Sequence, residues 1–292
     1  MNIKNLLNEI EQADPEVYEK LDTRRSTMKQ FAGLAGKLAA VAVPFALGSM
    51  FKKAYGRGTG TQTLFDVLNF ALTLEYLEAK FYSMGNAAAT GGTLAIPAGV
   101  ERTTFTTIGA HETAHVTYLK NAITAAGGSP VAEPTFDFTA GNGNNNGPFA
   151  GVFTNYALFL AVAQTFEDTG VRAYKGQATD PDLIQNNDVL QAALQIHSVE
   201  ARHAAAVRRI RKANGGLVPA GVNVKPWITL NQSGIDSAAV QPSYDGEQIT
   251  NQATIEIVNI NGQTISASAA SEAFDEPLTK AQVLAIVDPF IV

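Results

Sequence analysis

The chain has 292 residues, of which 46% are hydrophobic and 16% charged, and it contains no cysteine. This composition fits a compact globular protein with a substantial core. The formal net charge of -6 at pH 7 argues against a nucleic-acid partner, which needs a concentrated basic face. Without cysteine, disulfides and thiolate metal sites are excluded, so a bound metal would need carboxylate and imidazole ligands.

Residues 1–61 are predicted to be an N-terminal extension. Within them, Arg24-Arg25 precedes an apolar run of small residues at 38–48, an order similar to a twin-arginine export signal. The alternative is an amphipathic helical arm that packs on the body or on a neighbouring subunit. An export signal implies a periplasmic or other extracytoplasmic location, and the alternative a cytoplasmic one. We expect membrane contact, if it occurs, through residues 30–50.

Residues 62–214 have the pattern of four amphipathic helices. Apolar residues recur at helical spacing in four segments, at about 63–83, 101–125, 152–174 and 188–213. Residues 129–151, rich in Pro, Gly and Asn, join the second segment to the third and are long enough to run the length of a helix. The first and third segments are apolar around much of their circumference. This predicts cover by another chain in a homo-oligomer, or by the extensions.

Two Glu-x-x-His steps lie near the middle of the second and fourth predicted helices. They are Glu112 to His115 and Glu200 to His203, and they use two of the four histidines in the chain. Because residues i and i+3 share one face of a helix, each step directs a carboxylate and an imidazole to the same point. This pattern is typical of a helical bundle that binds a metal in its core.

The first and third predicted helices share a different pattern, a mid-helix glutamate with a tyrosine seven residues later. The pairs are Glu75 with Tyr82 and Glu167 with Tyr174. Four carboxylates and two imidazoles at one height of a bundle suit two divalent ions, iron as the expected metal and manganese as the alternative. The predicted metal ligands are Glu75, Glu112, His115, Glu167, Glu200 and His203.

In their order along the chain these residues resemble the ferritin-like di-iron carboxylate superfamily. The segments 166–170 and 274–278, with Pro289-Phe290, resemble more narrowly the exported ferritin-like domain proteins related to plant desiccation-response proteins. The resemblance implies a mainly α fold, a ferritin-like four-helix bundle with a long crossover between its second and third helices. It also implies a di-metal oxidoreductase of stress response or metal homeostasis, reactive with dioxygen or peroxide as a ferroxidase or a catalase/peroxidase-like enzyme.

Several alternatives stay open. The string His111 to His115 matches the His-Glu-x-x-His motif of zinc peptidases, in which both histidines bind one zinc and Glu112 is the general base. That interpretation leaves Glu200 and His203 unexplained. A non-enzymatic stress or desiccation-associated protein, in which metal mainly stabilises the bundle, is the other class of function.

Some polar residues near the predicted ligands have no assigned role. Tyr82 and Tyr174 are candidate catalytic residues that support the ligands or react by redox chemistry, or else they are core packing. The same choice applies to Glu78. His111 is unassigned outside the peptidase motif, and His197 is predicted either to support a ligand or to pack with a hydrogen bond.

Residues 215–292 are predicted to be a C-terminal extension of small, irregular and β structure. Residues 254–265 alternate around Asn261-Gly262, which indicates a short hairpin. A short helix is expected at 278–287, docked by the apolar end of residues 289–292. We expect this extension to cover the bundle or to join subunits.

Overall fold

The computed structural model describes residues 61–215 and 217–292. The Arg24-Arg25 pair, the apolar run at 38–48 and the expected membrane contact at 30–50 lie outside the described residues. Within the described part of the chain, no helix combines the length and the apolar character that crossing a membrane requires.

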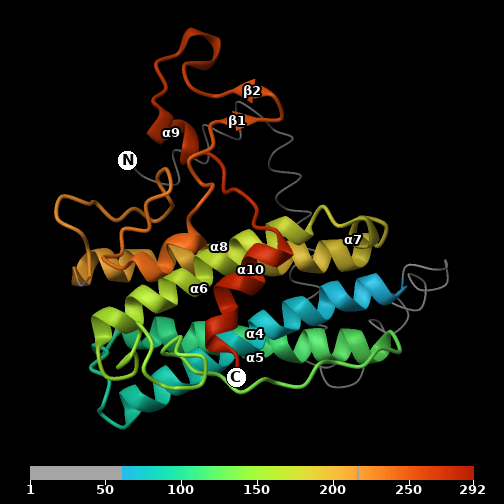
Figure 1. Ribbon diagram of the computed structural model, residues 1–292, viewed down its shortest axis with the longest axis vertical. Helices are drawn as coiled ribbons and strands as arrows, with labels where there is room; N and C mark the ends of the chain where they lie inside the picture. Colours follow the sequence, from blue (N-terminus) through green and yellow to red (C-terminus); the bar gives the residue numbers. More distant parts are fainter. Residues whose placement is uncertain (1–60, 216) are drawn as a thin grey trace, which may run out of the picture.

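Four long helices form the bundle (Figure 1). They are α4 (Thr61–Thr90), α5 (Val100–Ala125), α6 (Tyr156–Gln177) and α8 (Asn187–Asn214). α4 packs most extensively against α5, and α6 against α8, so the bundle consists of two helix pairs. The short helix α7 (Pro181–Ile184) lies in the connection between α6 and α8. The prediction of a mainly α four-helix bundle is confirmed.

Two of the predicted helix boundaries are wrong. α4 continues for two turns beyond residue 83, because residues 86–90 contain alanines that favour helix, and it ends before Gly91-Gly92. α6 begins at Tyr156 instead of residue 152. Asn155 is its N-cap, and the Asn155 side chain accepts a hydrogen bond of 3.1 Å from the backbone N–H of Leu158.

The connection between α5 and α6 runs along the bundle, so that α6 starts at the end opposite to the one where α5 stops (Figure 1). The Asp137 carboxylate organises this segment. It accepts hydrogen bonds from the backbone N–H groups of Thr139, Gly143 and Asn145 at 3.0, 3.0 and 2.9 Å. The neighbouring Phe136 forms an isolated antiparallel bridge with Ile291, which joins the crossover to the C-terminal end of the chain.

The hairpin predicted at residues 254–265 is wrong, and the extension contains a hairpin at residues 251–256 instead. Strands β1 (Asn251–Gln252) and β2 (Ile255–Glu256) pair antiparallel, and the turn between them is Ala253-Thr254. Both turn residues have positive φ, 49° and 71°, which a tight two-residue hairpin turn of type I′ requires. Asn261-Gly262 instead belongs to a 3₁₀ turn, η2 (Ile260–Gly262). The Asn261-Gly262 dipeptide therefore correctly indicated a turn, but this turn does not join two paired strands.

The remaining elements of the extension are η1 (Ala238–Ser243), α9 (Ala267–Ser271), α10 (Lys280–Val287) and η3 (Asp288–Phe290). α10 starts with a capping box. The Thr279 side chain accepts a hydrogen bond from the backbone of Gln282, and the Gln282 side chain accepts one from the backbone of Thr279.

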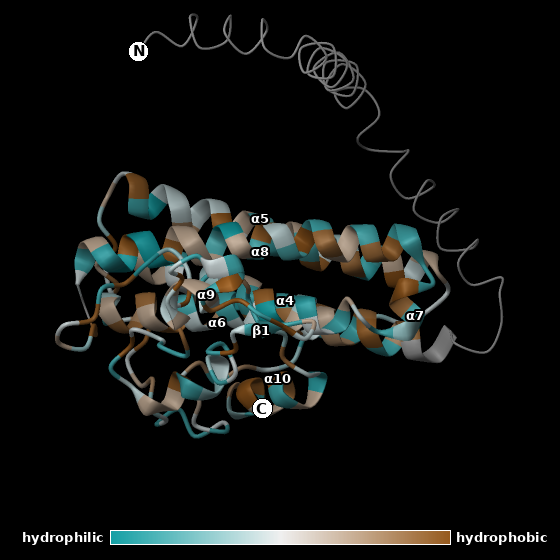
Figure 2. Cartoon of the chain, turned by 90° about the horizontal axis from the view of Figure 1, so that it is seen from above, coloured by the Kyte–Doolittle hydropathy of each residue, from teal (hydrophilic) through white to brown (hydrophobic). Residues whose placement is uncertain are grey.

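Part of the extension, including α10, packs on the face of α4 and α6 that points away from α5 and α8 (Figure 2). Another part contacts α8, where Arg208 and Arg211 donate hydrogen bonds to carbonyls of the extension. Every residue of α6 from Phe159 to Tyr174 is buried. Arg172 ties α6 to the extension, because its guanidinium donates hydrogen bonds of 2.7 and 2.8 Å to the carbonyls of Ser243 and Asp245 and lies 2.7 Å from the Glu247 carboxylate. The apolar circumference of α6 is thus covered by the same chain. The homo-oligomer stays a prediction.

We expect Phe290→Ala to destabilise the metal-free protein by about 3 kcal/mol, because it removes a buried ring and leaves a cavity. Phe290 is 4% exposed, and its ring packs on those of Phe149 and Phe166. The measurement is urea unfolding followed by circular dichroism. Phe274→Ala in the same extension is the control, because Phe274 is 39% exposed and its loss should change stability by less than about 0.5 kcal/mol. Equal losses would contradict the docking of the C-terminal end.

Candidate metal centre

The six predicted ligands converge at the middle of the bundle. Their ligand atoms form two groups, within each of which all the atoms lie within 4.8 Å of one another. One group is Glu75, Glu112, His115 and Glu200, and the other is Glu112, Glu167, Glu200 and His203. The two glutamates of the Glu-x-x-His steps belong to both groups, and each group adds one further glutamate and one histidine. The structure therefore places two four-residue sets side by side.

Burial makes this cluster unusual. The four glutamates are all 0% exposed, and the side chains of His115 and His203 are 13% and 5% exposed. The cluster separates two apolar parts of the core along the bundle. On α5 it lies between Ile108 and Leu119, and on α8 between Ile196 and Val207, which belong to different hydrophobic clusters. The site is a charged layer between apolar ones.

Each histidine faces several carboxylates through its Nδ1 atom. His115 Nδ1 lies 3.1, 3.0 and 3.2 Å from oxygens of Glu75, Glu112 and Glu200. Burial lowers the pKa of His115, but the facing carboxylates of Glu112, Glu200 and Glu75 outweigh this effect and raise that pKa to about 12. His203 behaves in the same way: burial lowers its pKa, and the carboxylates of Glu167, Glu112 and Glu200 raise it to about 12.

The carboxylates respond differently to their surroundings. Burial raises the pKa of Glu75 well above its usual value and that of Glu167 to about 8, although His203 opposes the shift of Glu167. Burial also opposes ionisation of Glu112, but the adjacent imidazoles of His115 and His203 hold its pKa at about 2. Without a cation, the buried layer therefore retains protons that an exposed layer would release.

Several buried atoms of the centre lack a hydrogen-bond partner among the described residues. They are Glu112 Oε1, Glu167 Oε2, both carboxylate oxygens of Glu200, and His203 Nδ1. His203 Nδ1 lies 2.8 Å from Glu112 Oε1 and 3.3 Å from Glu167 Oε2, yet these atoms do not align as hydrogen bonds. Unpaired buried polar atoms are costly, and a divalent cation would satisfy them together. The residues present fit metal ions.

Both candidate tyrosines lie against the centre, and each reaches across to the other helix pair. The Tyr82 hydroxyl donates to Glu167 Oε1, and the Tyr174 hydroxyl donates to Glu75 Oε1. In both glutamates the other oxygen, Oε2, faces a histidine. Burial, and then the facing glutamate, raises the pKa of both tyrosines well above 10, so they remain neutral donors. They hold the two unshared glutamates in place.

His111 is placed differently from what the peptidase motif requires. It belongs to neither four-residue set, and its Nδ1 lies 3.0 Å from Nε2 of His203, the nitrogen on the far side of that ring from the centre. The two rings stack with centroids 5.2 Å apart. His111 thus supports His203 from the exposed side, which argues against a zinc held by His111 and His115. His197 Nδ1 lies 3.1 Å from the carbonyl oxygen of Val171 and acts as a packing histidine.

Glu78 is a fifth carboxylate beside the centre. It is 3% exposed and lies one turn after Glu75 on the same helix face, but it is in neither four-residue set. Its neighbour across the bundle is Gly170, where an added Cβ atom would lie 3.1 Å from Glu78 Oε1. Burial, and then the charge of Glu200, raises the pKa of Glu78 well above its usual value. The i+3 spacing from Glu75 was the only sequence signal for it.

Fold and site together define a helical bundle whose core contains a buried carboxylate and histidine cluster compatible with a metal site. The chain belongs to the ferritin-like domain family, because the sequence model of that family matches residues 63–213, more than half of the chain. No curated protein and no solved structure matches the chain.

We expect the metal-free protein to lose stability as the pH rises from about 6.5 to 8. Folding raises the pKa of His115 and His203 from 6.5 to about 12 and that of Glu167 from 4.5 to about 8. A group whose pKa is raised on folding stabilises fully below its unfolded pKa, and this contribution is lost as the pH rises through its folded pKa. The measurement is the melting temperature in the presence of a chelator.

Glu167→Gln provides the control for this experiment, because it removes one of the groups whose pKa is raised on folding while keeping the side-chain shape. Its melting temperature should fall less over the same pH interval. A wild-type melting temperature that rises from pH 6.5 to 8 would contradict the electrostatic description of the centre.

Proposed function

We propose that the protein is a di-metal oxidoreductase that binds two iron ions and transfers their electrons to dioxygen or peroxide. The observation that supports this most is the sharing of Glu112 and Glu200 by the two four-residue sets. Shared carboxylates can bridge two ions, while one histidine and one further glutamate complete each set. Glu75 and His115 would hold one ion, and Glu167 and His203 the other. Manganese, with peroxide as the substrate, is the alternative.

Two bound ferrous ions would each supply one electron, so that dioxygen and two protons give hydrogen peroxide, or hydrogen peroxide and two protons give two waters. The chain would supply the positions of the ligands. Tyr82 and Tyr174 orient Glu167 and Glu75 through hydrogen bonds, His111 orients His203, and the apolar layers on both sides keep bulk water away.

The direct test is to load the metal-free protein anaerobically with ferrous ion and then add dioxygen. We expect two iron ions per chain and uptake of about one dioxygen molecule for every two ions oxidised, as a two-electron reduction requires. The measurements are metal analysis and an oxygen electrode. Binding of a single ion per chain, with zinc preferred, would overturn the proposal.

Substitution of a shared ligand should differ from substitution of an unshared one. We expect Glu200→Ala to weaken binding of both ions, and Glu75→Ala to weaken mainly one of them, each by more than the roughly 10- to 100-fold that loss of a supporting residue causes. Calorimetric titration with ferrous or manganous ion separates the two cases. Glu133→Ala is the control, because the Glu133 side chain is 45% exposed in the crossover. Equal effects of Glu75→Ala and Glu200→Ala would contradict the sharing.

A structural role for the metal is the second candidate. It is favoured by the position of the charged layer between two apolar clusters, because ions bound there would connect all four helices. Such a protein would bind metal and melt at a higher temperature with it, but would consume no dioxygen or peroxide. The loading experiment therefore separates the two candidates.

A further inference from the structure

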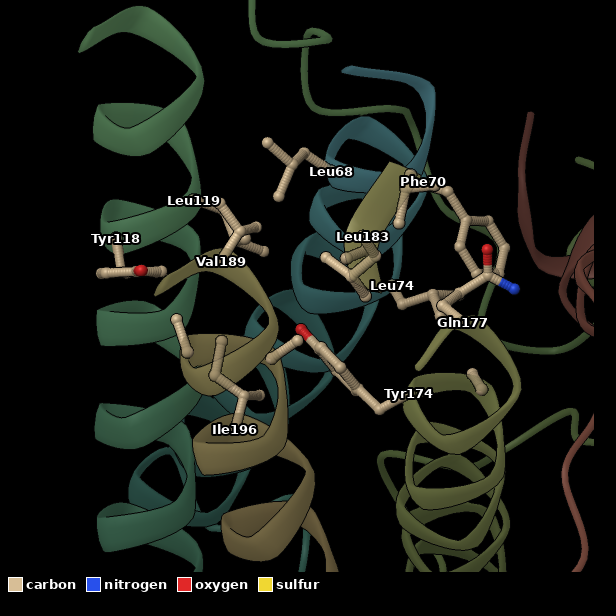
Figure 3. A pocket seen from close by; sticks show the side chains of 15 residues that line it. Leu68, Phe70, Leu74, Tyr118, Leu119, Tyr174, Gln177, Leu183, Val189 and Ile196 are labelled. Carbon is tan, nitrogen blue, oxygen red and sulfur yellow. The ribbon is translucent and has the colours of Figure 1, made fainter. Parts of the chain in front are cut away.

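A small apolar cavity lies between the four helices, close to α7 (Figure 3). Its volume is about 30 Å³, and nearly all of its lining is apolar. Leu183 of α7 contributes to the lining, and Leu183 is 1% exposed. Half-buried residues, among them Tyr118 and Gln177, also line it. A cavity of this volume holds one small molecule, since a molecule the size of water needs about 10–15 Å³.

The cavity lies one helical turn from the first four-residue set. Three of the helices contribute a lining residue four positions away from a member of that set, and one turn of helix rises 5.4 Å. The pairs, lining residue first, are Ala71 and Glu75, Leu119 and His115, and Ile196 and Glu200. The fourth helix contributes Tyr174, whose ring lines the cavity and whose hydroxyl donates to Glu75.

The corresponding place in the other half of the bundle is filled. Tyr82 is the counterpart of Tyr174, and its ring packs against the rings of Phe81, Phe105 and Phe159 with centroids 5.4, 6.3 and 6.4 Å apart. The two halves share one ligand pattern but differ in packing. The open space borders the tyrosine that holds Glu75, and aromatic rings surround the one that holds Glu167.

The apolar lining of the cavity determines which small molecules it can bind. Apolar cavities in proteins stay dry and take up apolar guests such as xenon. Water or hydrogen peroxide would leave hydrogen-bonding groups unpaired there, because the surface of the lining is almost entirely apolar and the Tyr174 hydroxyl already donates to Glu75. Dioxygen is small and apolar, and it needs no hydrogen-bond partner in such a space.

We propose that this cavity is a binding site for a small apolar molecule of the class of dioxygen, beside Glu75 and His115. The role of the site in the reaction rests on the proposed function, whereas the binding itself does not. The inference favours dioxygen over peroxide as the oxidant. It also implies that dioxygen reaches the centre from the side of Glu75.

The experiment compares wild type with Ala193→Leu, which adds three carbons at a half-buried α8 position in the lining. Ala87→Leu is the matched control, because Ala87 is an exposed helical alanine of α4 that does not line the cavity. Xenon binding is followed by ¹²⁹Xe NMR on the metal-free protein. Rates of ferrous oxidation are then measured separately with dioxygen and with hydrogen peroxide on the loaded protein.

We expect xenon to bind wild type and Ala87→Leu, and Ala193→Leu to lose that binding. We also expect Ala193→Leu to slow oxidation by dioxygen by about tenfold while changing the rate with peroxide by less than about twofold. Ile196→Val, which enlarges the cavity, should bind xenon at least as well as wild type and keeps the test valid if Ala193→Leu does not fold.

Absence of xenon binding in wild type would overturn the cavity proposal, and so would an equal slowing of both oxidations by Ala193→Leu. Failure of the loaded wild type to react with dioxygen would instead overturn the proposed function. In that case xenon binding that Ala193→Leu abolishes would still support the apolar site. The two failures are therefore distinguishable.

Discussion

Four fully buried glutamates at one height of a helical bundle are the constraint on which the rest of the structure depends. Buried carboxylates are tolerated only with compensating charge and hydrogen bonds. Two imidazoles and two tyrosine hydroxyls supply part of this compensation. The unpaired oxygens of Glu112, Glu167 and Glu200 show that the compensation within the chain is incomplete. Divalent ions would complete the compensation. The same atoms that make the layer costly without ions make it compatible with a metal site.

The surrounding fold protects this layer from water. α5 and α8 lie on one side of α4 and α6, and part of the C-terminal extension, including α10, packs on the other, so the two helices that carry the unshared glutamates are covered on both faces (Figure 2). Buried polar contacts fix the cover to the bundle: Tyr244 of the extension donates a hydrogen bond of 2.8 Å to the Asp168 carboxylate of α6, and Arg208 of α8, which pairs with the same carboxylate, donates to the carbonyl of Trp227 in the extension. The extension thus belongs structurally to the core that contains the site.

The two halves of the centre are alike in their ligands and unlike in their surroundings. His111 supports only His203, and Glu78 on α4 has Gly170 as its counterpart on α6. The cavity borders Tyr174, whereas aromatic rings enclose Tyr82. These differences would give ions bound to the two four-residue sets different access to solvent and to small molecules. A symmetrical ligand pattern is therefore compatible with an asymmetrical reaction.

The sequence by itself determined the helical bundle and brought six residues to one height. Helical periodicity and the i+3 spacing are local properties, and local geometry decides which side chains share a helix face. It also predicted the long crossover, since composition and length are local too.

Only the tertiary structure decided which groups meet across the bundle. It paired Tyr82 with Glu167 and Tyr174 with Glu75, showed Glu112 and Glu200 as common to both sets, and used the chain's own extension to cover α6. The tertiary structure also decided that the hairpin turn lies at Ala253-Thr254 and that a cavity lies beside Tyr174. The physical reason is that these outcomes depend on packing between segments many tens of residues apart in the sequence. The spacing of residues within one segment does not predict such packing.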